Sequence, residues 1–222
     1  MTKSLIGMAL AACFAAACSN GADEASASAT LQSASTDAWQ DALPPNASAP
    51  TLGDSVRLRG CTYAVGTAVE EPPFPPQYIA FVQRSGNARR CSLGYVVIGS
   101  SFATPSVAIA AGEGALVADA SSKSTPSGEA HTQLRIVQID PASGDFVRQT
   151  TLAAQSPGPN QPQLGNVTTG SLAIEHGGDL VVQGQKDGII PGETGSGDNY
   201  IATYDGFLHG PESPAPTTVV AF

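Results

Sequence analysis

The sequence has 222 residues, of which 41% are apolar and 13% charged, with 24 glycines and 17 prolines. Charged residues are about half as frequent as the ~25% of average domains, which excludes coiled coils and highly charged disordered chains. Acidic residues outnumber basic ones 19 to 10, for a net charge of −9, and this excess argues against binding to nucleic acid or to an anionic lipid surface.

The N-terminus has the pattern of an export signal. Lys3 precedes an apolar run from Leu5 to Ala17, which is too short to span a bilayer and has the length of a signal-peptide core. The run ends at Cys18 after three alanines. This resembles the signal of bacterial lipoproteins, in which a cysteine after small residues is lipidated and becomes the mature N-terminus. We therefore expect residues 1–18 to be a lipoprotein signal peptide with lipidation at Cys18.

Two alternatives to Cys18 stay open. Cys13 follows Leu-Ala-Ala and fits the preferred lipoprotein pattern better, but cleavage there leaves the apolar Phe14 on the mature chain. The second alternative is an ordinary secretory signal, in which case Cys18 has no role in processing.

A lipidated chain is held to a membrane by its acyl groups. Since Ser19 replaces the aspartate that retains such proteins in the inner membrane, the resemblance implies the outer membrane.

Residues 19–50 are predicted to be a flexible tether. Ala, Ser, Thr, Asp and Asn dominate this stretch, and prolines close it, a composition that buries too little apolar surface to offset the entropy of ordering. The segment 36–43 is either a helical turn capped by Thr36, with Trp39 and Leu43 on one side, or an unfolded spacer. Residues 51–222 are expected to form the folded domain.

The folded part is predicted to consist of repeated β-rich units. SVAIAAGEGALVADA from Ser106 and SLAIEHGGDLVVQGQ from Ser171 each contain an alternating strand, a tight glycine turn and a second strand. A vaguer copy from Ser55 turns at Gly60 and continues over residues 62–68. The third and fourth strands of the copies are predicted at 78–83 and 93–98, at 134–140 and 146–152, and at 200–205 and 217–222. This makes twelve short strands in three groups of four.

Four antiparallel strands that recur in this way are typical of a propeller blade. The copy at 171–205 is more specific: LAIEHGGDLVVQG, a loop with IPG, then GDN and YIATYD resemble the bacterial β-propeller repeat called SBBP. The copy from Ser106 resembles that repeat moderately, and the first copy resembles it in outline. The resemblance implies a propeller outside the cytoplasm, without shared catalytic residues.

The predicted fold class is all-β, with about three four-stranded antiparallel propeller-like blades after the signal peptide and the tether. Closed propellers have roughly four to eight blades. The three blades therefore form an open stack, a dimer that closes as six blades, or three compact sheets wrapped in another way.

Cys61 and Cys91 are predicted to form a disulfide, because an exported protein meets an oxidising compartment. In a four-strand meander the turns that hold these cysteines lie at the same end of the sheet. Alternate strands are roughly 9.6 Å apart, so at least one cysteine must lie in a bent loop outside the strand pairing. The absence of a C-x-x-C motif favours a structural role over a redox role.

The long connections of such meanders emerge at one end of the sheets, where binding groups often lie. That end carries a candidate binding face with Lys123 and Lys186 among acidic residues and one histidine: Glu70, Glu71, Glu129, His131, Asp187, Glu193 and Asp198. These groups either bind a cation or a basic partner, or form a solvated acidic rim. The proline-rich run 72–76 is either a stiff loop or a polyproline ligand.

Linear catalytic patterns are absent from the sequence: it has no G-x-S-x-G, H-E-x-x-H, P-loop or EF-hand motif, and its three histidines are isolated. Neither a catalytic residue, a cofactor nor a metal site is therefore predicted. Residues 51–100 are net basic and residues 101–222 net acidic, which suits head-to-tail contact or self-association through Arg84, Arg89 and Arg90. The alternative is a phosphate or lipopolysaccharide contact at these arginines.

The sequence as a whole predicts a lipid-anchored extracytoplasmic β-propeller-repeat lipoprotein that acts as a non-catalytic binding or scaffold module with an unidentified protein or glycan partner. The alternative is a secreted propeller-type hydrolase or lyase with a site built from loops. A deep pocket that combines His131 with several loop acids would favour the enzyme, and a flat polar face would favour binding.

Overall fold

The fold was analysed in a computed structural model that describes residues 39–72, 74–87, 91–126, 131–156 and 163–222. All of these residues belong to one unit, Gln32–Phe222, and every regular element in the described ranges is a β-strand. The prediction of an all-β protein is therefore confirmed. The expected signal peptide, Cys18 and residues 19–38 of the expected tether lie outside the described residues. Within these ranges no helix is long and apolar enough to cross a membrane.

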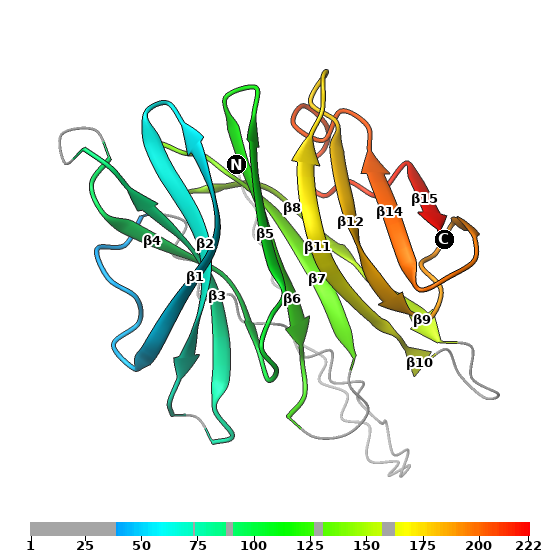
Figure 1. The fold of residues 1–222 in the computed structure, drawn as a ribbon, viewed down its shortest axis with the longest axis horizontal. Coiled ribbons are helices and arrows are strands. Elements are labelled where there is room, and N and C mark those ends of the chain that lie inside the picture. Colours follow the sequence, from blue (N-terminus) through cyan, green and yellow to red (C-terminus); the bar gives the residue numbers. More distant parts are fainter. Residues whose placement is uncertain (1–38, 73, 88–90, 127–130, 157–162) are drawn as a thin grey trace, which may run out of the picture. The chain divides into compact units, whose positions relative to one another are not determined.

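The first sheet is an antiparallel meander of four strands (Figure 1). It consists of β1 (Ala47–Leu58), β2 (Cys61–Glu70), β3 (Gln77–Ser85) and β4 (Gly94–Ser101). β1 begins inside the segment where the sequence predicts a tether. Arg59 and Gly60 join β1 to β2 with positive φ angles of 50° and 84°, and glycine at the second position relieves the strain of this tight turn.

The second sheet contains two further meanders. The second meander is β5 (Val107–Gly112), β6 (Ala115–Lys123), β7 (Thr132–Ile139) and β8 (Phe146–Leu152). The third meander is β11 (Asn166–Ile174), β12 (Leu180–Asp187), β14 (Asn199–Tyr204) and β15 (Thr218–Ala221), to which β13 (Glu193–Gly195) adds in parallel. A single bridge between Asn166 and Thr132 joins these two meanders into nine strands. β9 (Gln155–Ser156) and β10 (Gln163–Leu164) form a separate ribbon.

All twelve predicted strands are present, and the strands of the described ranges form no closed sheet. The segments from Ser106 and Ser171 occupy corresponding places in the strand order, because β5 and β11 are each the first strand of a meander and each pairs with the next strand through a glycine-containing turn. The first strands also contact one another, β1 with β5 and β5 with β11 (Figure 1). The short β9, β10 and β13 were not predicted, since two or three residues carry no readable alternation.

Two hydrophobic clusters lie between the meanders. The first interface cluster joins the first two meanders and includes Tyr63, Val65, Val82, Val96, Ile98, Ile109, Leu116, Ala118, Val137 and Ile139. The second interface cluster joins the second and third meanders and includes Val117, Leu134, Ile136, Leu152, Val167, Leu180, Val182, Tyr200, Tyr204 and Phe207. Consecutive residues of β6, such as Leu116 and Val117, enter different clusters. The second meander is thus buried on both faces.

The outward face of the first meander is partly covered by the chain that precedes it. Phe81 is fully buried there, with Leu43 and Ala47 packed around the same small cluster. Gly66 permits this packing, because a Cβ at that position would lie 2.6 Å from the carbonyl oxygen of Thr51 and 2.7 Å from Cζ of Phe81. The backbone of β1 therefore approaches the aromatic ring closely only because residue 66 lacks a side chain.

Residues 39–43 pack against the first two meanders and are not helical. Gln40 forms an antiparallel bridge with Tyr95 on β4. The indole of Trp39 donates from Nε1 to the carbonyl oxygen of Pro141 at 3.3 Å, and its ring centroid lies 5.7 Å from that of Tyr63. The guanidinium of Arg84 covers the same indole at 4.7 Å. Trp39 thus links the first meander to the β7–β8 turn of the second.

The predicted disulfide is present. Cys61 is the first residue of β2, and Cys91 lies in the connection before β4, with 5.5 Å between the two Cα atoms. The expectation that one cysteine must lie outside the strand pairing is confirmed, because Cys91 is in a bend rather than in a strand. Both cysteines are buried at the edge of the first interface cluster.

Candidate functional site

The residues of the predicted acidic face have different surroundings in the structure. Glu70 Oε1 accepts a hydrogen bond from Asn46 Nδ2 at 3.0 Å, whereas Glu71, Asp187 and Asp198 have exposed side chains. His131 is half-buried, with no hydrogen-bond partner for Nδ1 among the described residues. Glu129 lies outside the described residues. In the described part of the chain, His, Cys, Asp and Glu side chains form no group of three that could hold a metal ion.

Glu193 forms a buried ion pair inside the β12–β14 connection. Lys186 Nζ lies 3.1 Å from Glu193 Oε1, and the two side chains are only 5% and 9% exposed. The ammonium also donates to the carbonyl oxygen of Gly188 at 2.8 Å, and Glu193 Oε2 accepts from the backbone N–H of Ile190 at 2.8 Å. Both charges are therefore satisfied within the loop, and Glu193 fixes the loop's conformation rather than facing a ligand.

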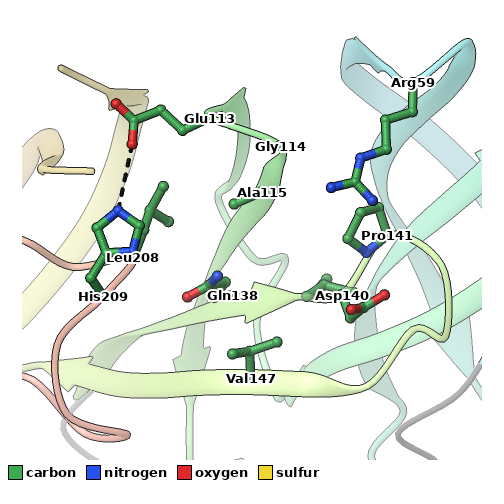
Figure 2. A pocket seen from close by; sticks show the side chains of 11 residues that line it. Arg59, Glu113, Gly114, Ala115, Gln138, Asp140, Pro141, Val147, Leu208 and His209 are labelled. Atoms are coloured by element: carbon green, nitrogen blue, oxygen red, sulfur yellow. Dashed lines mark ion pairs between the residues drawn. The ribbon is translucent and has the colours of Figure 1, made fainter. Parts of the chain in front are cut away.

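The opposite end of the sheets holds a small cavity where all three meanders meet (Figure 2). Arg59 reaches it from the β1–β2 turn, Glu113 from the β5–β6 turn and His209 from the β14–β15 connection. Glu113 Oε2 lies 3.6 Å from His209 Nε2, and its Oε1 accepts from the backbone N–H of Gly177 at 2.9 Å. The glutamate thus connects the second meander to two segments of the third.

The residues around this cavity connect the three meanders, and the cavity is too small for an ordinary ligand site. Its volume of about 180 Å³ is below the roughly 300–1,000 Å³ of ordinary small-molecule pockets. Asp140, which also lines it, uses Oδ1 to accept from the backbone N–H groups of Ala142 and Ser143 at 2.7 and 3.0 Å. Asp140 therefore stabilises the turn that joins β7 to β8. The pairing of Glu113 with His209 was not predicted, because the two residues are far apart in sequence.

A larger and shallower groove lies on the outward face of the third meander. Its volume is about 500 Å³, and it is lined by Thr168, Thr169, Gly170, Ser171, Gln183, Gly184, Gln185, Asn199, Tyr200 and Phe222. None of these residues has a charged side chain. Ser171, Gln183, Gln185, Asn199 and Phe222 are exposed. The sequence pattern did not single out this groove, because alternating polar residues on a strand are the ordinary pattern of a solvated sheet face.

Asp119 is a buried carboxyl in the second interface. Its side chain on β6 is fully buried, and Oδ1 accepts from the backbone N–H of Ala108 at 2.9 Å. Its Oδ2, the hydroxyl of Thr169 and the hydroxyl of Tyr204 are buried without a hydrogen-bond partner among the described residues. Burial raises the pKa of Asp119 to about 8, so the carboxyl is mostly protonated at neutral pH. Asp119 lines neither of the two cavities.

Asp119 also affects the pKa values of two tyrosines of β14. Burial, and secondarily the charge of Asp119, raises the pKa of Tyr200 and of Tyr204 above the usual value. The Tyr200 hydroxyl donates to the carbonyl oxygen of Thr168 at 3.1 Å. Perturbed carboxyls often mark active sites, but Asp119 is fully buried and lines neither of the two described cavities.

Neither a protein-family model nor a curated protein matches the sequence. The resemblance of residues 171–205 to the SBBP repeat therefore stays a prediction from the sequence.

Proposed function

We propose that this protein is a lipid-anchored extracytoplasmic module of the bacterial cell envelope, built from three propeller-type blades, and that it functions by non-catalytic binding. The apolar run that ends at Cys18 supports the anchor, and Ser19 supports the outer membrane. The groove on the outward face of the third meander carries the binding function, because it is the larger of the two described cavities and is lined by exposed polar side chains.

The arrangement of the meanders supports the assignment as blades. Each of the three has four antiparallel strands, their first strands contact one another, and their inward faces share two hydrophobic clusters. Neighbouring propeller blades pack in this manner. The two terminal faces suit an open stack, because Leu43 and Ala47 partly cover one, and the other exposes the polar Ser171, Gln183 and Gln185 beside Val220, as capping repeats carry a polar outer face.

The position of His131 favours binding over the alternative of a secreted hydrolase or lyase. An enzyme built from the long loops needs a pocket that combines this histidine with several of the acidic residues. His131 lines neither described cavity, and Glu193 is paired inside its own loop. The exposed acids Glu71, Asp187 and Asp198 support a solvated rim.

The anchor is tested by expressing the full-length chain in a Gram-negative host. Mass spectrometry of the mature N-terminal peptide should show an acylated Cys18, and the protein should sediment with the outer membrane. Cys18→Ser should abolish the acylation and the sedimentation with the outer membrane, and the matched control Cys13→Ser should preserve both. An unmodified mature N-terminus, or release by Cys13→Ser instead, would contradict the proposed anchor.

The binding function is tested by crosslinking in intact cells, followed by purification of the full-length protein under denaturing conditions. The expected result is a reproducible covalent adduct with one envelope component, at a yield that saturates as expression rises. Adducts that increase without saturation, or conversion of an envelope polymer to shorter products by the purified protein, would refute a non-catalytic binding module.

A further inference from the structure

The groove on the outward face of the third meander presents three side-chain amides from neighbouring strands. Gln183 and Gln185 lie on β12, two residues apart and therefore about 7 Å apart on the same face. Asn199 on β14 is the register partner of Gln185. All three side chains are exposed, and within the described residues none of the three amides makes a hydrogen bond. The groove therefore offers donors and acceptors that the fold itself does not use.

The chemistry of these groups matches a sugar. Each amide supplies two N–H donors and a carbonyl acceptor, and adjacent hydroxyls of a pyranose both donate and accept, so one amide can engage two neighbouring hydroxyls. Ser171, the register partner of Gln183, adds a hydroxyl on the same face. Phe222 is 58% exposed at the groove and offers an apolar ring to the C–H face of a sugar.

The charge distribution disfavours an anionic ligand. The lining residues have no charged side chain, so no cation is present to pair with a phosphate or a carboxylate. The chain as a whole carries a net charge of −9, which disfavours anionic polymers further. The volume of about 500 Å³ is within the roughly 300–1,000 Å³ of sites that hold small ligands.

We propose that the outward face of the third meander binds a neutral polysaccharide through Gln183, Gln185, Asn199 and Phe222. This inference rests on the proposed binding function and names its ligand class.

A second copy of the chain fits this face less well. The inward face of the same strands carries Leu180, Val182 and Ala202, all fully buried, whereas the outward face carries exposed amides and hydroxyls beside the exposed Val220 and Phe222. Packing an apolar sheet face against it would bury the amides of Gln183 and Gln185 without hydrogen-bond partners, which is unfavourable. Hydroxylated sugars would satisfy the same amides.

The test is calorimetric titration of the full-length protein in detergent with neutral hexasaccharides of α-glucan, β-glucan, β-mannan, β-xylan and chitin type, and with an oligogalacturonate as the anionic comparison. At least one neutral probe should bind. Gln183→Ala combined with Gln185→Ala, and separately Phe222→Ala, should each weaken that binding by about tenfold or more, as the loss of hydrogen bonds or of ring contact predicts. Thr203→Ala is the matched control, since it lies on the same face outside the groove, and should leave affinity unchanged.

Circular dichroism spectra like those of the wild type would establish that the variants are folded. The inference is overturned if no neutral probe binds, if only oligogalacturonate binds, or if the groove variants bind as tightly as Thr203→Ala. Crosslinking to an envelope component that persists in the groove variants would sustain the broader binding function while eliminating this site.

Discussion

Asp119 is a buried carboxyl whose ionisation destabilises the folded protein. The carboxyl is fully buried between two meanders, with a single backbone donor to one of its oxygens. Desolvation raises its pKa from 3.8 to about 8, because the charged form loses its hydration and gains no cation. The sequence places Asp119 in an apolar strand, but only the packing of β11 and β14 against β6 shows that it is sealed from water.

Asp119 should make the protein less stable as the pH rises. Between about pH 4 and about pH 8 the folded state keeps a proton on Asp119 that the unfolded state has released, so the free energy of unfolding falls through this window and levels off above it. Asp119→Asn is neutral throughout and lacks this loss. Urea unfolding at several pH values should show the variant's stability relative to wild type increasing from about pH 4 to about pH 8.

Asp145→Asn, in an exposed turn, is the control and should show no such trend. A stability difference between Asp119→Asn and wild type that does not change with pH would show that the Asp119 carboxyl is not protonated preferentially in the folded state.

The Lys186–Glu193 ion pair is also buried, and its contribution to stability can be tested. Glu193→Ala leaves the buried ammonium of Lys186 without its carboxylate and should lower the free energy of unfolding by about 3–5 kcal/mol. Lys186→Met combined with Glu193→Leu removes both charges and should cost far less. Equal losses for the single and the double variant in urea unfolding would show that the pair matters through packing and not through charge.

At the scale of the element, the twelve strands could be predicted because alternation and glycine turns are local properties. The prediction failed where an element depends on contacts made elsewhere. Trp39 lies in a stretch with the composition of a spacer, yet the partners of its indole are Pro141, Tyr63 and Arg84. β1 begins at Ala47 because its first residues pair with the end of β2, which a composition argument cannot show.

The disulfide stabilises the first meander by linking the start of β2 to the connection before β4. Removing it with Cys61→Ala and Cys91→Ala should lower the free energy of unfolding by roughly 3.5 kcal/mol, the chain-entropy value for a 30-residue separation. Urea unfolding of the oxidised wild type, the reduced wild type and the double variant tests this. The reduced wild type should match the double variant, and identical midpoints for all three would contradict the expectation.

For the whole molecule, the difference between the two faces of the third meander bears on whether the proposed blades close into a ring. A six-bladed dimer requires that face to be as apolar as the inward one, but it exposes Ser171, Gln183, Gln185 and Thr218 beside Val220. Among the three arrangements compatible with the sequence, this favours the open stack.

Light scattering on the chain from Ser19 onward, without the predicted signal peptide, should therefore give the mass of a monomer at all concentrations tested. Val220→Lys, on the same outward face and 45% exposed in the wild type, should leave that mass and the thermal midpoint unchanged. A concentration-dependent dimer that Val220→Lys abolishes would instead establish this face as a contact between copies.

The sequence by itself determined the strands, their grouping into fours and the pairing of Cys61 with Cys91. Strand alternation and turn residues are local properties of the sequence, and the small number of cysteines limits the possible pairs. The tertiary structure alone decided which polar residues are buried away from water and which are exposed to it. Asp119 and Gln183 both interrupt apolar strands, but the first faces a neighbouring meander and the second faces solvent. That distinction depends on which sheet packs against which face, and packing between residues distant in sequence leaves no local pattern.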